Sequence, residues 1–121
     1  MPEVIRAADC GNSPKNQRAE EIALALYGVG ALPEDQIAQD AVWDRAAGAV
    51  SGRRAILGAI DPDGIARVAI DQVVTHGKAG SVSGRITRGA DTRLFCHVIR
   101  FTSASARQIA QLVSFEHPGG R

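Results

Sequence analysis

The hydrophobic pattern of the chain changes from a helical period to a two-residue period near residue 61. Before that point, residues 13–30 place apolar side chains such as Ile22 and Leu26 on one helical face. Ser13 can cap this helix and Pro14 suits its first turn, while two glycines end it. The pattern predicts a helix with one buried face.

Two shorter helices and a brief strand are predicted next. "LPEDQIAQ" is expected to form a helical turn opened by Pro33, and "AVWD" at 41–44 a short strand. Ser51 can then cap a third helix, "GRRAILGAI", which carries an apolar stripe. Three helices therefore precede the main sheet in this interpretation.

After the turn "DPDG" at 61–64, the residues alternate and are rich in β-branched side chains, as in strands. Short joints between consecutive strands predict an antiparallel meander, and helices that precede a sheet predict the α+β class. We expect strands at 65–76, 79–88, 92–103 and 107–116.

Alternation also assigns the faces of these strands. In 65–76, Val68, Ile70 and Val74 share an apolar face. Strand 92–103 has no polar face, because Phe95, His97, Ile99 and Phe101 alternate with Leu94, Cys96 and Val98. Helices can cover only one side, so the second side suggests a partner subunit.

Size and charge exclude several classes of function. A chain of 121 residues is expected to form a single domain, 1–121, with a lead-in at 1–12 and a tail at 117–121. A net charge of +1 with scattered arginines gives no basic face for nucleic acid. Neither a leader nor a membrane-spanning run is visible, so a cytoplasmic protein is expected. Cys10 and Cys96 are interpreted as free thiols, and neither a metal site nor a cofactor is predicted.

The predicted order of elements resembles that of the nuclear transport factor 2-like superfamily, which includes SnoaL-type cyclases and ketosteroid isomerases. This order is three helices, with a short strand before the third, followed by a curved meander. The more specific matches are "DCGNSPK", "VWDRAAGAVSGRRAI", "VVTHGKAGSVSGRI", "FCHVIRF" and "IAQLVSFE". They look like a small bacterial branch of unassigned function. The resemblance implies a cone-shaped α+β barrel, with three N-terminal helices packed on a strongly curved, mainly antiparallel four-stranded sheet plus one short strand. It also implies a pocket between helices and sheet, and a homodimer through the outer face of the sheet.

The resemblance carries two candidate catalytic residues. His97 occupies the position of the isomerases' oxyanion-binding aspartic acid, and Asp44 is the nearest counterpart of their general base. Tyr27 lies too close to the helix end to match their tyrosine donor. Each candidate has a structural alternative: His97 as a core residue bonded to a carbonyl group, and Asp44 as a solvated carboxylate at a strand end. Trp43 and Asp44 alternate, so only one of them can face the pocket.

The leading hypothesis is an apolar pocket that holds a small, partly apolar molecule, with His97 as the polar contact. Its expected lining consists of Trp43, Val82, Ile86, Phe95, Ile99, Phe101, Leu112 and Ser114. The alternatives are a proton-transfer enzyme of isomerase, cyclase or dehydratase type that uses Asp44 and His97, and a non-catalytic dimeric adaptor.

Overall fold

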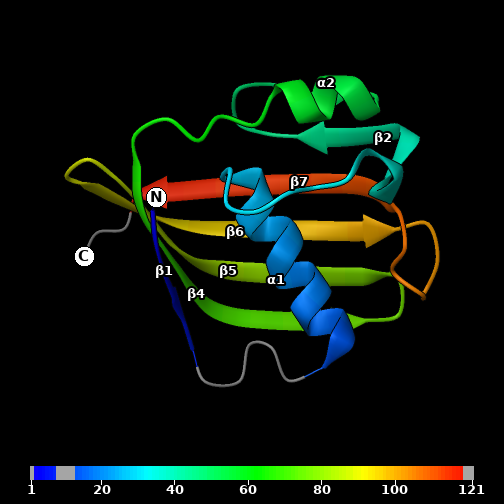
Figure 1. Cartoon of the computed structure of the whole chain (residues 1–121), viewed down its shortest axis with the longest axis horizontal. Helices are drawn as coiled ribbons and strands as arrows, with labels where there is room; N and C mark the ends of the chain where they lie inside the picture. The colour runs from blue at the N-terminus through cyan, green and yellow to red at the C-terminus, as the bar shows by residue number, and fades with distance from the viewer. Residues whose placement is uncertain (1, 8–12, 119–121) are drawn as a thin grey trace.

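A curved seven-stranded sheet dominates the computed structural model, which describes residues 2–7 and 13–118 (Figure 1). Its order is β1-β4-β5-β6-β7-β2-β3, with β1–β4 and β2–β7 parallel and the other pairs antiparallel. The strands are β1 (Glu3–Arg6), β2 (Ile37–Asp44), β3 (Val50–Ser51), β4 (Ile65–His76), β5 (Ala79–Arg88), β6 (Asp91–Phe101) and β7 (Ile109–Pro118). The helices are α1 (Pro14–Leu26), the 3₁₀ turn η1 (Glu34–Gln36) and α2 (Arg53–Gly58).

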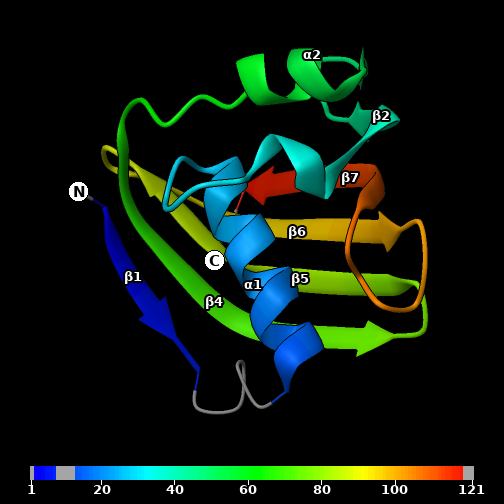
Figure 2. The same cartoon turned by 45° about the vertical axis from the view of Figure 1, so that its right-hand side comes forward.

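Helix α1 crosses the concave face of the sheet and packs on β4 and β5 (Figure 2). Its start is as predicted, because the Ser13 hydroxyl accepts a hydrogen bond from the Asn16 N–H, 3.1 Å away, and Pro14 begins the first turn. Beyond its end, Gly28 adopts a φ of 82°, which favours glycine. The apolar face of α1 is buried against the sheet and forms one core with it.

The four predicted strands of the meander are confirmed, as β4 to β7. Their inward positions make most of the core, since alternation places every second side chain on the concave face. Fully or almost fully buried side chains on these strands are Val68, Ile70, Val82, Ile86, Phe95, Ile99, Phe101, Ile109 and Leu112.

The predicted architecture of three N-terminal helices on a four-stranded sheet plus one short strand is wrong. The described residues hold two α-helices, one of them only six residues long, and a seven-stranded sheet. The expected second helix is a single 3₁₀ turn, closed by a bond from the Gln36 N–H to the Pro33 carbonyl. The chain then enters β2 at Ile37, which is fully buried and lies opposite Ile109. Sheet pairing here overrides a local helical pattern.

Two further elements differ from the expectation. Residues Glu3–Arg6, treated as a lead-in, form the edge strand β1 beside β4, too short for its alternation to be recognised. Helix α2 is capped by Gly52, whose φ is 98°, and Ser51 belongs to β3 instead. Cys10, expected to be a free thiol, lies outside the described residues, whereas Cys96 is a free thiol.

A β-bulge in β4 moves one predicted core residue to the surface. The register with β5 shifts between Ile70 and Gln72, so Val73 faces Val82 across the strands and is buried. Val74, predicted to share the face of Val68 and Ile70, is 49% exposed. One extra residue inverts the alternation beyond it, which no pattern of hydrophobicity alone reveals.

Candidate functional site

A cavity of about 300 Å³ opens where the end of α1 meets β2 and the ends of β5, β6 and β7. Its wall combines a buried polar group, an aromatic surface and a charged mouth, which is the usual composition of a small-molecule site. The residues that line it are Leu26, Tyr27, Trp43, Arg45, Ala46, Ala47, Ala59, Asp61, Arg88, Arg93, His97, Ser114 and Glu116.

A chain of hydrogen bonds runs from Trp43 to His97 along the wall of this cavity. His97 on β6 lies directly opposite Ser114 on β7, and its Nδ1 atom is 2.7 Å from the Ser114 hydroxyl oxygen. The indole N–H of Trp43, on β2, donates to the same oxygen at 2.8 Å. Three neighbouring strands thus fix the histidine ring from one side.

This chain favours one of the two neutral tautomers of His97. An indole N–H can only donate, so the Ser114 oxygen accepts from Trp43. The single hydroxyl proton is satisfied when it is donated to Nδ1 of His97, and the neutral ring then has its proton on Nε2. The Nε2 atom is buried and has no hydrogen-bond partner among the described residues. His97 lines the cavity, and in this tautomer its Nε2–H is a donor without a partner among the described residues.

Burial keeps the His97 ring neutral. Its exposed fraction is 2%, and the rings of Tyr27 and Phe95 lie with centroids 5.0 and 5.2 Å from its own. Desolvation lowers the pKa of His97 to about 4, although the negative charge of Glu116 acts in the opposite direction. At neutral pH the ring is a hydrogen-bond donor without charge.

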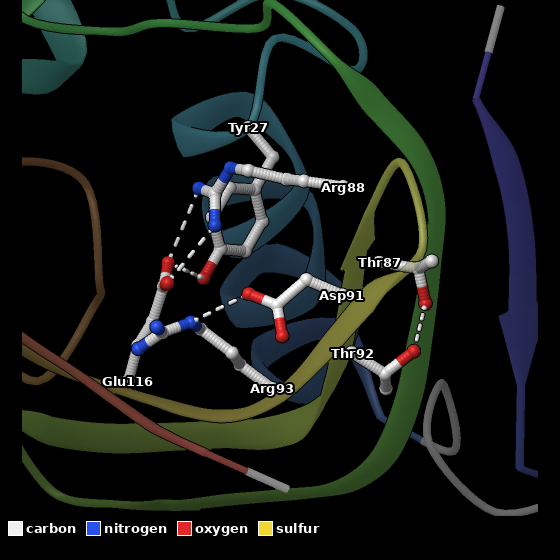
Figure 3. Close-up of polar contacts among 7 residues, drawn as sticks. All are labelled: Tyr27, Thr87, Arg88, Asp91, Thr92, Arg93 and Glu116. Atoms are coloured by element: carbon white, nitrogen blue, oxygen red, sulfur yellow. Dashed lines mark hydrogen bonds and ion pairs between the residues drawn. The ribbon is translucent and has the colours of Figure 1, made fainter.

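A second network closes the cavity near its mouth (Figure 3). The Glu116 carboxylate accepts two bonds from the Arg88 guanidinium, at 2.9 and 3.2 Å, and one from the Tyr27 hydroxyl at 3.1 Å. Arg88 also lies over the Tyr27 ring, 5.6 Å from its centroid. Burial and Glu116 raise the pKa of Tyr27, so the phenol keeps its proton and continues to donate.

Sequence reasoning missed this network. Its members come from the end of α1, the end of β5 and the end of β7, which are far apart in the chain. One signal was available: Glu116 shares the alternation of Ser114 and therefore the inner face of β7. Glu116 accepts its bond from Tyr27, at the end of α1. Sequence analysis judged Tyr27 too close to the helix end to match the tyrosine donor of the isomerases, and this position brings its side chain to the mouth of the cavity.

The structure divides the predicted site residues into two groups. Trp43, His97 and Ser114 meet in the cavity wall. The other predicted lining residues are buried in the core, where α1 packs directly on the concave face: Val82, Ile86, Phe95, Ile99, Phe101 and Leu112.

Asp44 lies on the other face of β2 from Trp43, as their alternation requires. It is not among the described residues that line the cavity. Its carboxylate accepts a hydrogen bond from the Gln111 amide at 3.1 Å, and it lies opposite Val113 on β7. Asp44 and His97 therefore do not face one common cavity.

A wider depression of about 750 Å³ lies near the start of α1, beside the loop 102–108. Two of its basic side chains, Arg18 and Lys15, already have partners within the chain. Arg18 donates to the carbonyl oxygens of Ala106 and Arg107 and to the Gln36 side chain, and Lys15 donates to the Gly77 carbonyl. The smaller cavity is the better candidate site of the two, because its lining includes a residue, His97, whose buried Nε2 atom has no partner among the described residues.

Neither a metal cluster nor a membrane-spanning helix is found in the part of the chain that the structure describes. Over residues 2–7 and 13–118, three or more His, Cys, Asp or Glu side chains nowhere gather as they would around a metal ion. Across the same residues, every helix is too short or too polar to cross a membrane.

Comparison with known proteins identifies the fold. No family model matches the sequence, and no curated protein matches it. A nuclear transport factor 2-like protein of unknown function from Burkholderia xenovorans superimposes with a TM-score of 0.66 at 14% identity, over 87% of this chain and 82% of that one. A candidate ketosteroid isomerase from Kribbella flavida does so with a TM-score of 0.66 at 13% identity, over 93% and 83%.

A third similar structure is a nuclear transport factor 2-like protein of unknown function from Cytophaga hutchinsonii. Its TM-score is 0.57 at 9% identity, over 70% of this chain and 72% of that one. Identities this low establish shared architecture and leave function open. The chain has the nuclear transport factor 2-like fold.

Proposed function

We propose that the protein binds a small, partly apolar molecule in the cavity beside His97, and that a hydrogen-bond-accepting oxygen of this ligand, such as a carbonyl oxygen, pairs with His97 Nε2. One observation carries the proposal: the Nε2 atom is buried without a partner among the described residues, while Nδ1 on the other side of the ring is held by Ser114. Leaving a buried donor unpaired costs about 1–3 kcal/mol, and a ligand oxygen would recover that energy.

The alternative of proton transfer between Asp44 and His97 has less support. The two side chains lie on different faces of the sheet, and a general base must come within hydrogen-bond reach of the proton that it removes. Glu116, the carboxylate whose charge acts on His97, is held by Arg88 and Tyr27. A neutral donor fixed in a cavity that is walled partly by aromatic and aliphatic side chains favours binding and polarisation of a carbonyl group.

The test is the binding of butyrophenone, a neutral aryl ketone, to the wild type and to His97→Asn. Asparagine can keep an acceptor near Ser114, but it removes the Nε2 donor. We expect affinity to fall about tenfold, the effect of losing one hydrogen bond in an enclosed site. Isothermal titration calorimetry measures the affinity of both proteins for butyrophenone. His76→Asn, the same change at an exposed hairpin residue, serves as the control. Equal affinity in wild type and His97→Asn, or no binding to the wild type, would contradict the proposal.

We further propose that two copies pair through the outer face of the sheet. Leu94 and Phe115 are 45% and 59% exposed there, and half-buried Cys96 lies directly opposite Phe115. Val98 and Val113, also half-buried, extend this patch along the same two strands. A sheet face that meets water is normally polar, so a continuous apolar patch favours a protein partner.

Sedimentation tests this assembly. We expect a dimer at micromolar concentration, and a monomer for Phe115→Asp, because a buried carboxylate without a partner opposes association. Ile5→Asp introduces the same charge at an exposed apolar residue on the distant edge strand β1 and should remain dimeric. A monomeric wild type would overturn the assembly proposal without affecting the proposed cavity.

A further inference from the structure

The charged groups at the mouth of the cavity are unequally paired. Arg88 is neutralised by Glu116, and Arg93 forms an ion pair with Asp91 at 3.0 Å (Figure 3). Arg45 lines the same mouth, and no carboxylate lies within ion-pair distance of it among the described residues. Within residues 2–7 and 13–118, the mouth therefore contains one guanidinium that forms no ion pair.

Arg45 is held in place although it has no ionic partner in the part of the chain that the structure describes. Its Nε atom donates to the Gly48 carbonyl at 3.1 Å, and its guanidinium carbon lies 5.3 Å from the centroid of the Trp43 ring. The side chain is half-buried, and Trp43 is 5% exposed. A guanidinium fixed through Nε and through its face keeps the terminal Nη groups available, and that fork matches a carboxylate.

Asp61 is the other carboxylate that lines the cavity, and it does not neutralise Arg45. It accepts the N–H of Asp63 at 3.1 Å. Its charge acts on Arg88, where it adds to the stronger effect of Glu116 in raising the pKa of that guanidinium. With Asp91, which pairs with Arg93, three arginines and three carboxylates surround the site, and Arg45 is the arginine that forms no ion pair among the described residues.

Trp43 links the two ends of the cavity. Its indole N–H donates to Ser114, which holds His97, and its ring supports Arg45. A ligand that lies along this ring would have a hydrogen-bond donor at its inner end and a cation at its outer end. Neither of these two groups has a protein partner of the required kind among the described residues.

We propose that the ligand is a small oxo acid: an apolar body with an acceptor oxygen for His97 and a carboxylate for Arg45. This inference rests on the proposed function and names the class of its ligand. The carboxylate assignment requires that Arg45 bind an anion. Binding of a neutral molecule beside His97 does not require this.

Two probes separate the contribution of the ketone oxygen to binding from that of the carboxylate. 3-Benzoylpropionate carries an aryl ketone and a carboxylate, and butyrophenone carries a similar ketone without the charge. Both are titrated by calorimetry, at low ionic strength, into the wild type, Arg45→Gln and Arg54→Gln. Arg54 is an exposed residue of α2 outside the cavity lining, so its substitution removes the same charge elsewhere.

We expect the wild type to bind 3-benzoylpropionate about fivefold more tightly than butyrophenone, as for a half-buried charge-assisted contact. Arg45→Gln should abolish this preference and Arg54→Gln should retain it. Added salt should weaken the preference, because the contact lies at a solvent-accessible mouth. Equal binding of the two probes by the wild type, or an unchanged preference in Arg45→Gln, overturns the inference.

The two proposals can fail separately. If butyrophenone binds and depends on His97 while 3-benzoylpropionate binds no more tightly, only the carboxylate assignment is overturned. If neither probe binds the wild type, the proposed function and this inference are both overturned.

Discussion

Acidification from pH 7 to pH 4 is expected to remove about 3 kcal/mol of folding stability through His97 alone. The folded ring has its pKa lowered to about 4 by burial, from 6.5. As the pH falls below 6.5, the unfolded chain takes up a proton that the folded ring does not, so the free energy of unfolding decreases. The stabilisation is complete above about pH 6.5 and is lost by about pH 4.

Urea unfolding of the wild type and of His97→Asn between pH 4 and pH 7 measures this contribution. Carboxylates titrate in both proteins, so the difference between the two pH profiles isolates the histidine. The stability advantage of the wild type should shrink by about 3 kcal/mol over this range. His76→Asn controls for the loss of a histidine as such. Parallel profiles of wild type and His97→Asn would mean that the ring is not held in its neutral form.

Gly84→Ala is expected to destabilise the fold by about 3 kcal/mol, at the upper end of the usual cost of overpacking. Gly84 lies on β5 between Ile70 and Phe95 of the neighbouring strands. A Cβ atom there would lie 1.8 Å from the Ala69 carbonyl oxygen and 3.1 Å from a Phe95 ring carbon. The first contact is with backbone, so no side-chain movement can relieve it.

The same substitution at Gly58 is the matched control. Gly58 ends α2, and a Cβ atom there would have no neighbour within 4 Å. Alanine favours a helix, so Gly58→Ala should leave stability unchanged or raise it by up to about 1 kcal/mol. Urea unfolding of both variants measures their free energies of unfolding and tests this difference. Equal stabilities would show that β4 does not approach β5 as closely as described, and the bulge between Ile70 and Gln72 would then need revision.

Sequence reasoning succeeded where a local pattern determined the structure. The meander followed from alternation and turn residues, and the start of α1 from Ser13 and Pro14. Sequence reasoning failed where pairing with a distant strand determined the secondary structure or the exposed face of a segment. Ile37 belongs to a strand because β7 lies beside it, and Val74 is exposed because a bulge precedes it. Such long-range pairings leave no periodic signal in the segment itself.

The candidate site was likewise predictable where a local pattern determined it, and not where distant strands meet. Placing His97 among inward-facing residues required only alternation, and its exposed fraction of 2% confirms an interior position. The partners of His97 could not be inferred from spacing, because Trp43 and Ser114 reach it from two other strands. The charged mouth depends on residues from α1, β5, β6, β7 and two loops that meet around one cavity, which only the folded chain reveals.

The most direct test of the account is the protonation state of His97 with and without a ligand. Nitrogen-15 NMR of the histidine rings at pH 7, assigned with His97→Asn, should show a neutral ring whose proton is on Nε2. Addition of butyrophenone should shift the Nε2–H resonance as the ketone oxygen accepts its hydrogen bond. A proton on Nδ1, or an Nε2–H signal that butyrophenone leaves unchanged, would contradict the central claim that His97 offers its free donor to a ligand.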